Sequence, residues 1–260
     1  MTQDLKVTTG IVQKNVQIAE SVYEMAVETE ICKDFIPGQF INVYLDDKSM
    51  LLPRPISICD ADNSGVRIVY KIVGRGTKHL SAYRMNQEIK ISSPLGNGYH
   101  VADDATDKRI ALVAGGIGSP PMLGLVKKLT KQNADVSVFL GFPSQPFLVD
   151  EWKGLCEKVF IATDDGSFGF HGNVLELLRQ SGEIYDEYFS CGPKGMLKAI
   201  SEYLSSIERN MQVSLEERMG CGYGACLGCS CKIRENGAVT RKSVCKHGPV
   251  FLGKDVVWDE

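Results

Sequence analysis

The sequence of 260 residues has no long apolar run, no block of like charge and little net charge. A membrane-spanning helix needs about 20 consecutive apolar residues, and no run here approaches that length. The net charge is -3 at pH 7, so the chain lacks the basic footprint that binds nucleic acid or anionic membranes. Its first residues, MTQDLKVTTG, lack the apolar core of a signal peptide. We therefore expect a cytoplasmic protein.

Disulfide bonds are not expected either, although the chain has nine cysteines. Thiols in the cytoplasm stay reduced, which argues against a disulfide framework. Five of the nine cysteines fall between residues 221 and 245, and the other four, Cys32, Cys59, Cys156 and Cys191, stand alone. This distribution indicates local chemistry near the end of the chain rather than cross-links along it.

The first hundred residues predict a small antiparallel β-barrel. Short segments rich in Val, Ile and Tyr are separated by Gly, Pro, Asp or Asn at a spacing typical of barrel strands. Six strands are expected, at residues 6–19, 22–29, 38–45, 54–59, 65–73 and 87–92. One helix is expected over residues 77–85, with Thr77 as its N-cap.

Near Asp103 the pattern changes to alternating strands and helices. Strands are expected at residues 109–118, 135–142, 158–163 and 187–193, and helices at 119–132, 171–180 and 194–207. This alternation predicts a doubly wound parallel sheet. Ser119 suits the N-cap of the first of these helices, and a proline suits its first turn.

A cysteine-rich segment with short β-like pieces ends the chain. These pieces cover residues 230–236, 239–244 and 250–258. The predicted fold class is therefore a β-barrel joined to an α/β domain and a small cysteine-rich subdomain. The predicted domain limits are 1–102 for the barrel, 103–211 for the α/β domain and 212–260 for the cysteine-rich subdomain.

The cysteines of this segment have the spacing of iron–sulfur ligands. The pattern is Cys221-x4-Cys226-x2-Cys229, followed by fifteen residues and then Cys245. C-x4-C-x2-C with a distant fourth cysteine is the plant-type [2Fe–2S] pattern. Small residues between the cysteines let backbone N–H groups approach the sulfurs and stabilise a negative cluster. We therefore predict that Cys221, Cys226, Cys229 and Cys245 bind a [2Fe–2S] cluster.

Other interpretations of these thiols stay open. A zinc site favours two C-x2-C pairs, and only Cys226 and Cys229 form one, although His247 could join the set. Redox-active or structural thiols are a third interpretation. Cys231 is surplus to four ligands. Strand alternation would turn it to the same face as Cys229, and we interpret it as a buried small residue near the cluster.

Two stretches of the barrel region together predict an anion site. Residues 54–58 read RPISI, and Arg54 offers a fixed cation for a phosphate. Residues 70–80 read YKIVGRGTKHL, in which glycines precede a helix whose free N–H groups would face an anion. Ordinary strand core is the alternative for Tyr70, Lys71 and Ile72.

Two stretches of the α/β region end predicted strands. Residues 114–122 read AGGIGSPPM, which is not G-x-G-x-x-G, so a generic turn is an alternative to a phosphate site. Three glycines there would let a phosphate approach the helix start: Gly115, Gly116 and Gly118. Residues 190–196 read SCGPKGM, in which Cys191 could also be a core thiol at the end of a strand.

These four stretches, in this order, resemble the ferredoxin–NADP reductase superfamily. In that superfamily the barrel holds FAD and the α/β domain binds a nicotinamide dinucleotide. The resemblance implies that Arg54 contacts the pyrophosphate and that Ser57 bonds near flavin N5. It implies flavin contacts at Arg54, Pro55, Ile56, Ser57, Tyr70, Lys71, Ile72, Gly76 and Thr77.

The same resemblance implies where the nicotinamide dinucleotide binds. Its positions are Gly115, Gly116, Gly118, Gly192 and Pro193, with Cys191 beside the hydride path. Ser57 and Cys191 are thus the predicted catalytic positions. The GFPS stretch after the second α/β strand offers no Arg or Lys for a 2′-phosphate, which favours NAD over NADP. The loop of residues 163–172 is a weaker candidate for cofactor contact.

Together with LEERMGCGYGACLGC at residues 215–229, these stretches resemble the electron-transfer subunits of bacterial, NAD-dependent, two-subunit dihydroorotate dehydrogenases. The resemblance runs from about residue 5 to 258. It implies that an FMN-containing partner subunit oxidises dihydroorotate in pyrimidine (UMP) biosynthesis. Electrons would pass through the [2Fe–2S] cluster and FAD to NAD+, in a heterotetramer of two plus two subunits.

Two alternatives to this function remain. A related FAD and [2Fe–2S] subunit could serve another partner, as in a ferredoxin–NADP transhydrogenase or a sulfhydrogenase. A zinc-stabilised module without enzymatic activity is the alternative from another class, and the metal content distinguishes it.

Overall fold

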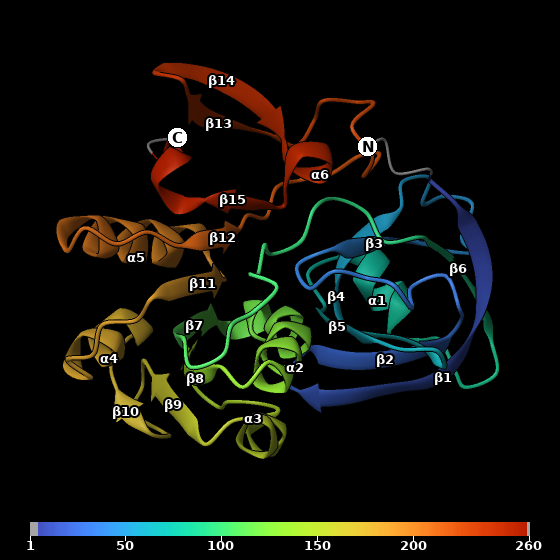
Figure 1. The fold of residues 1–260 in the computed structure, drawn as a ribbon. Helices are drawn as coiled ribbons and strands as arrows, with labels where there is room; N and C mark the ends of the chain where they lie inside the picture. Colours follow the sequence, from blue (N-terminus) through green and yellow to red (C-terminus); the bar gives the residue numbers. More distant parts are fainter. Residues whose placement is uncertain (1–4, 259–260) are drawn as a thin grey trace.

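The computed structural model describes residues 5–258 and has three parts, which Figure 1 colours along the chain. A closed barrel comes first, in blue to teal. A sheet with helices follows, in green to orange, and the cysteine-rich end of the chain, in red, lies beside both (Figure 1). This arrangement confirms the predicted fold class.

The barrel consists of six strands in the closed order β1-β2-β5-β4-β3-β6, and all its neighbours are antiparallel. The strands are β1 (Val7–Ala19), β2 (Val22–Glu28), β3 (Phe40–Tyr44), β4 (Arg54–Ala61), β5 (Gly65–Lys71) and β6 (Glu88–Ser92). Each predicted strand is present, because Val, Ile and Tyr side chains suit a pleated and half-buried surface.

Strand β3 shows how the barrel relates to the rest of the molecule. Side chains of a strand alternate between its two faces. Ile41 and Val43 are fully buried among the apolar residues inside the barrel. Phe40 instead packs in a second core, together with Cys229 and Cys245. The outer face of β3 is therefore covered by the cysteine-rich segment.

The helix of the barrel, α1 (Arg75–Leu80), begins two residues earlier than expected. The prediction of Thr77 as its N-cap is wrong, since Gly74 occupies that position. Thr77 is the third helical residue, and its hydroxyl accepts hydrogen bonds from the N–H groups of Val73 (2.9 Å) and Gly74 (3.3 Å). The threonine thus reaches back to satisfy the turn before the helix.

The second part is a seven-stranded sheet in the order β10-β9-β8-β7-β11-β12-β15. The strands are β7 (Arg109–Gly115), β8 (Asp135–Phe142), β9 (Lys158–Thr163), β10 (Phe170–His171), β11 (Glu187–Cys191), β12 (Gln212–Ser214) and β15 (Val250–Leu252). All pairs are parallel except β12 with β15. The order reverses between β7 and β11, and the carboxyl ends of the strands at such a reversal point are where ligands bind in sheets of this kind.

Helices cover both faces of this sheet, as a doubly wound fold requires. On one face α2 (Leu123–Lys131) and α3 (Val149–Leu155) share a core with Ile110 and Leu112 of β7. On the other, α4 (Val174–Gln180) and α5 (Lys194–Ser206) pack with the alternate residues of the same strand. None of the helices between residues 5 and 258 is long and apolar enough to cross a membrane.

The helix after the glycine loop starts later than predicted. Two short 3-10 turns, η1 (Gly116–Gly118) and η2 (Pro120–Met122), precede α2. Ser119 is the N-cap residue of η2 and prolines fill the first turn, as predicted, although the cap belongs to a 3-10 turn and not to α2. Its hydroxyl donates to the carbonyl of Gly116 at 2.8 Å and caps no N–H group.

Helix α3 was not predicted. It has seven residues and only Trp152 among them is buried, so its sequence carries no helical period. Its N-cap, Leu148, has a left-handed backbone (φ 58) and makes no capping hydrogen bond, so the start signal of a helix is also missing.

The cysteine-rich part holds a hairpin of β13 (Ser230–Glu235) and β14 (Ala238–Ser243), followed by α6 (Val244–His247) and, after β15, a 3-10 turn, η3 (Gly253–Asp255). Strands β12 and β15 both follow residue 211, yet they extend the α/β sheet. The cysteine-rich segment is thus tied into the second part by backbone pairing. The domain limits at residues 102 and 211 stay a prediction.

Candidate flavin, nicotinamide and iron–sulfur sites

The four predicted cluster ligands form two contacting pairs. Cys221 and Cys226 lie in the loop between β12 and β13, and the N–H group of Cys226 donates to Sγ of Cys221 at 3.4 Å. Cys229 precedes β13 and Cys245 lies in α6, and the N–H group of Cys245 donates to Sγ of Cys229 at 3.4 Å. Burial, together with the nearby thiols of Cys229 and Cys221, raises the pKa of Cys245 to about 12. The cysteines far apart in sequence are therefore neighbours.

The loop also supplies the N–H donors that an iron–sulfur cluster needs. Burial opposes ionisation of Cys221, but backbone hydrogen bonds from Tyr223, Cys226 and Ala225 outweigh it and lower the pKa of Cys221 to about 6. These N–H donors point at the sulfur of Cys221 and favour its negative form. Gly222 and Gly224 have positive φ (80° and 90°), which lets the loop turn its N–H groups inward.

The donor set fits a [2Fe–2S] cluster on two grounds, the four thiols and the inward N–H groups. Cys229 and Cys245 are buried, with exposed fractions of 1% and 2%, whereas Cys226 is exposed. One side of the site therefore faces the protein core and the other faces the surface. Within residues 5–258, no three His, Cys, Asp or Glu side chains are arranged to hold a single metal ion.

Cys231, the surplus thiol, has different surroundings. It lies on β13 and lines a cavity of about 320 Å³, together with Lys194 and Glu217. Burial, with a smaller contribution from the charge of Glu217, raises the pKa of Cys231 to about 11. Its thiol is therefore neutral at physiological pH, which suits the buried small residue that we predicted.

On the flavin side, the structure brings Arg54 and Gly76 together. A Cβ atom on Gly76 would lie 1.8 Å from Nε of Arg54, so only glycine lets the guanidinium cross the first turn of α1. Nη1 of Arg54 donates to the carbonyl of Leu52 at 2.5 Å, which holds the side chain in this place. The cation and the turn thus form one surface, as a pyrophosphate site requires.

The other predicted flavin residues differ in how far their side chains are exposed. Pro55, Ile56 and Ser57 follow Arg54 on β4 and are all half-buried. The side chain of Tyr70 lies in the barrel core, and its hydroxyl donates to Oδ1 of Asn15 at 2.9 Å. Lys71 is exposed and Ile72 is half-buried, and Thr77 is buried with its hydroxyl engaged in the turn. For Tyr70 the side chain serves the barrel core.

The two predicted nicotinamide stretches meet at the reversal point of the sheet. Gly115 ends β7, and a Cβ atom there would lie 3.0 Å from Cδ of Pro193. A Cβ atom on Gly118 would lie 2.6 Å from the carbonyl oxygen of Cys191. Gly116 adopts φ 52, and Gly192 adopts φ 157. The glycines thus allow the ends of β7 and β11 to approach each other, where a dinucleotide binds in this class of sheet.

Cys191 itself is buried at the end of β11. Burial raises its pKa to about 12, an effect that a hydrogen bond with Ser214 only partly offsets. A thiol of this kind stays protonated and acts by packing, not as a base or nucleophile. The buried hydroxyl of Tyr99 donates to the carbonyl of the preceding residue, Ser190, at 2.9 Å and steadies the same strand end.

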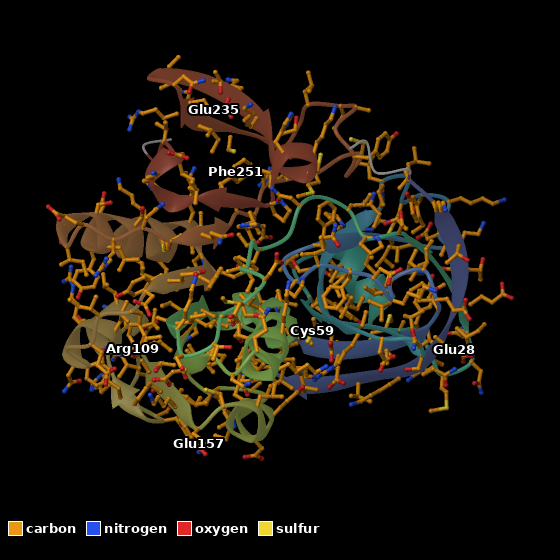
Figure 2. The ribbon with its side chains drawn as sticks, in the orientation of Figure 1. Glu28, Cys59, Arg109, Glu157, Glu235 and Phe251 are labelled. Atoms are coloured by element: carbon orange, nitrogen blue, oxygen red, sulfur yellow. The ribbon has the colours of Figure 1, made fainter. Side chains whose placement is uncertain are left out.

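The glycine loop lies next to the strands that carry the predicted flavin residues. The turn η2, which follows the loop, packs against β4 and β5. Figure 2 shows Cys59 of β4 where the barrel meets the α/β part, and its carbonyl oxygen lies 3.2 Å from a Cβ atom built on Gly124 of α2. The two predicted catalytic positions, Ser57 and Cys191, therefore come from parts of the molecule that are packed together.

The predicted loop of residues 163–172 is held mainly by its own hydrogen bonds. The hydroxyl of Thr163 accepts from the N–H group of Phe168 at 3.0 Å, and Oδ1 of Asp165 accepts from the N–H group of Ser167 at 2.9 Å. The loop ends in β10, which pairs with β9. Its contact with a cofactor stays a prediction.

Two ion pairs fasten the barrel to the α/β part. Arg67 of β5 donates from both terminal nitrogens to the carboxylate of Glu151 in α3, at 2.6 and 2.8 Å. Lys127 of α2 pairs with Asp60 of β4 at 2.5 Å. Burial raises the pKa of Glu151, but the hydrogen bonds and charge of Arg67 outweigh burial and hold that pKa below its ordinary value of 4.5.

Replacing Glu151 with Gln is expected to lower the free energy of unfolding by about 1 kcal/mol at neutral pH. The lowered pKa of Glu151 means that its contribution is present above pH 4.5 and is lost as the pH falls below that value. Thermal unfolding of the wild type should therefore lose more stability than Glu151→Gln on acidification through this range. The exposed Glu157, seen at the surface in Figure 2, supplies the control variant Glu157→Gln. Equal acid sensitivity of all three proteins would contradict the prediction.

The barrel, the reversal point of the sheet and the cysteine loop define a class of protein. It is a reductase of the ferredoxin–NADP reductase type with an attached iron–sulfur subdomain, which supports FAD, an iron–sulfur cluster and NAD as cofactors. Residues 216–257 match the family described as the iron-sulfur cluster binding domain of dihydroorotate dehydrogenase B.

Relatives identify the family more closely. Two proteins named dihydroorotate dehydrogenase B (NAD(+)), electron transfer subunit, come from Fusobacterium nucleatum and Caldanaerobacter subterraneus. The first is 38% identical over 97% of this chain and 99% of its own length. The second is 40% identical over 95% of this chain and 97% of its own length. The chain belongs to this family of electron transfer subunits.

Solved structures support the fold. In a structure described as an NADH-dependent reduced ferredoxin-NADP oxidoreductase, one chain is 27% identical to this chain with a TM-score of 0.86, and 96% of this chain and 90% of that chain are covered. The cytochrome b5 reductase domain of Ulva prolifera nitrate reductase has a TM-score of 0.65 at 17% identity, with 78% and 94% covered. The second likeness shows the shared fold alone.

Proposed function

We propose that the chain transfers electrons from a dihydroorotate-oxidising partner subunit to NAD+. The partner would hold FMN, the path would run through the [2Fe–2S] cluster and FAD of this chain, and the reaction would serve pyrimidine biosynthesis in the cytoplasm. A complex of two plus two subunits is the assembly that we propose. The name of the relatives, which joins dihydroorotate, NAD(+) and electron transfer in one subunit, supports this function.

One observation supports the proposal: the three segments that carry the predicted sites pack together in the order that the electron path needs. The cysteine loop contacts the outer face of β3, where Nδ2 of Asn42 donates to the carbonyl oxygen of Cys221 at 2.8 Å. Strand β3 pairs with β4, which holds Arg54 and Ser57. The glycine loop of the α/β part continues into η2, which packs on β4. The flavin strand is thus in contact with both other sites.

The residues of the chain have separate tasks in this function. FAD, when bound, can exchange two electrons as hydride with a nicotinamide and single electrons with a cluster. Arg54 and the turn at Gly76 would hold its pyrophosphate. The glycines at the reversal point would admit the dinucleotide, and the neutral thiol of Cys191 would pack beside its reactive ring without competing as a nucleophile.

The surface around Cys226 is the side on which we place the partner. Leu227 is 67% exposed and Tyr223 is 49% exposed, and both lie in the cysteine loop. Leu227 also has a left-handed backbone (φ 56), a conformation that a leucine rarely adopts. Neither burial nor backbone preference accounts for leucine at this position, but an apolar contact with a partner would.

Replacing Leu227 with Asp is expected to weaken association with the partner subunit by at least about tenfold. Asp tolerates a left-handed backbone better than Leu, so folding should not suffer. The control is Val239→Asp, since Val239 is also exposed (53%) but lies on β14 of the hairpin. Affinity is measured with the purified FMN-containing subunit. Equal loss of affinity in Leu227→Asp and Val239→Asp would contradict our placement of the partner at the surface around Cys226.

A related reductase subunit of another complex is a second candidate, and the TM-score of 0.86 with the ferredoxin-NADP oxidoreductase structure favours it. The two candidate functions differ in the partner that must supply or receive the electrons. The experiment is to co-express the chain with candidate partners and assay NAD+ reduction. Our proposal expects dihydroorotate to reduce NAD+ only with the FMN-containing subunit present. Turnover of dihydroorotate by the isolated chain, or activity only with ferredoxin, would contradict it.

A further inference from the structure

Asn42 is a buried polar residue whose side chain makes no hydrogen bond to another barrel residue within residues 5–258. It lies on β3 between Ile41 and Val43, whose side chains fill the barrel interior. The side chain of Asn42 therefore points out of the barrel, toward the cysteine loop. Its exposed fraction is 0%. A buried amide is costly unless it makes hydrogen bonds, so its bonding partners identify its task.

The amide of Asn42 bonds to a predicted cluster ligand. Its Nδ2 donates to the carbonyl oxygen of Cys221 at 2.8 Å, across 179 positions of sequence. Its Oδ1 has no hydrogen-bond partner within the described part of the chain. The backbone N–H of Asn42 donates to the hydroxyl of Ser92, which fixes the strand but leaves the side chain to the loop. The only hydrogen bond of this side chain within residues 5–258 therefore joins two separate parts of the molecule.

The residue after Cys221 is shaped to receive this amide. Gly222 adopts φ 80, and a Cβ atom on it would lie 2.5 Å from Nδ2 and 2.6 Å from Oδ1 of Asn42. Any larger residue at 222 would push the amide off the carbonyl. The conformation of the loop at Gly222 therefore leaves just enough room for the amide of Asn42.

Through its backbone, Asn42 lies next to β4, the strand that carries predicted flavin residues. In the ladder between β3 and β4, Asn42 is paired with Pro55, the residue between Arg54 and Ile56. A hydrogen bond to the Cys221 carbonyl therefore ties the first cluster ligand to the strand pair that carries the predicted flavin residues. The separation between two redox centres controls electron transfer between them, so a fixed attachment at this point matters for function.

We propose that Asn42 is a positioning residue that fastens the Cys221 loop to the flavin strands and thereby fixes the cluster relative to the flavin. This inference rests on the proposed function, because it takes Cys221 as a ligand and β4 as a flavin strand. Asn42 touches neither reacting atoms nor sulfur. It acts through the peptide unit between Cys221 and Gly222.

The variant Asn42→Leu tests the inference, because Leu has a similar volume and removes the donor together with the unpaired acceptor. Losing the donor leaves the carbonyl oxygen of Cys221 without this partner, so the contact with the loop weakens. The apolar side chains inside the barrel are unchanged, so the barrel itself should stay folded. The matched control is Asn97→Leu. Asn97 also joins the barrel side to the cysteine-rich segment, but it bonds the carbonyls of His247 (3.0 Å) and Val250 (3.1 Å). Asn42→Ala is a second variant in case Leu does not fit.

Two measurements are made on the full chain. In the iron-loaded protein, the EPR spectrum of the reduced cluster should broaden or shift its g values in Asn42→Leu and not in Asn97→Leu, while the FAD content stays at the wild-type level. In the iron-free protein, the amides of residues 221–224 should exchange hydrogen about 5- to 10-fold faster in Asn42→Leu than in the wild type. Asn97→Leu should leave exchange at these amides unchanged.

Other outcomes overturn the inference. A wild-type EPR spectrum and wild-type exchange rates in Asn42→Leu would show that the contact positions nothing. Parallel loss of FAD and iron in both Asn42→Leu and Asn42→Ala would make Asn42 a general folding residue. The iron content of the wild type tests the proposed function separately. A wild-type chain that binds no iron would contradict the proposed function. Identical EPR spectra of the iron-loaded wild type and Asn42→Leu would contradict only the role of Asn42.

Discussion

Replacing Cys226 with Ser is expected to abolish the cluster and to leave FAD bound. Cys226 is the exposed member of the predicted ligand set, and its N–H group also donates to Sγ of Cys221. A serine hydroxyl is a hard and weakly acidic ligand that does not replace a thiolate on iron. Iron should fall from about two atoms per chain to nearly none. The flavin residues lie on other strands, so the FAD content should stay within the error of the wild type.

The matched control for this variant is Cys231→Ser. Cys231 lies on β13 and faces the cavity near Glu217, so its loss should leave the cluster absorbance and EPR spectrum nearly intact. Iron analysis, flavin analysis and EPR on the two variants form one experiment. Loss of iron in Cys231→Ser with retention in Cys226→Ser would mean that the ligand set is wrong. Zinc in place of iron in the wild type would contradict the cluster altogether.

Replacing Arg54 with Gln is expected to raise the dissociation constant of FAD by about 10- to 100-fold. A hydrogen bond to a charged group contributes about 1.5–3 kcal/mol, and each 1.4 kcal/mol is about a tenfold change in affinity. Gln keeps the capacity to donate a hydrogen bond but loses the charge and the two-pronged geometry of the guanidinium. Titration of the flavin-free chain with FAD, followed by flavin fluorescence, measures the change.

Two further variants make the Arg54 experiment specific. Arg75→Gln removes a neighbouring charge in an exposed residue, which bonds Ser49 at 3.3 Å, and should change FAD affinity far less. Gly76→Ala keeps the charge of Arg54 but displaces it, because the new Cβ would lie 1.8 Å from Nε. It should therefore weaken FAD binding like Arg54→Gln. Equal affinities of Arg54→Gln and Arg75→Gln would contradict a pyrophosphate contact at Arg54.

Much of the fold could be predicted because local patterns and tertiary structure agree here. The alternation of Val and Ile in the first hundred residues gave the barrel strands, and apolar runs ending in glycine gave β7 and β11. The cysteine spacing indicated the ligand set because a loop around a cluster has fixed geometry. Helix α3 was missed because a helix with one buried residue, Trp152, shows no repeating pattern of apolar residues in the sequence.

The contacts that join the parts could not be predicted. Nothing near Asn42 in the sequence indicates that its amide meets a carbonyl 179 positions away. Arg67 and Glu151 likewise look like ordinary surface charges until β5 and α3 are packed together. The hydroxyl of Tyr70 donates to Asn15, a partner 55 positions away that its own strand does not indicate, and its contact with the flavin stays a prediction. Such residues depend on tertiary neighbours that no local pattern records.

An anaerobic titration of the isolated chain with NADH tests the path from nicotinamide through flavin to cluster. We expect NADH to bleach the flavin absorbance and then to produce the EPR signal of a reduced [2Fe–2S] cluster in the same chain. In Cys226→Ser the flavin should still be bleached and the cluster signal should be absent. A wild-type chain in which NADH reduces the flavin but never the cluster, although about two irons are bound, would contradict the path from nicotinamide through flavin to cluster.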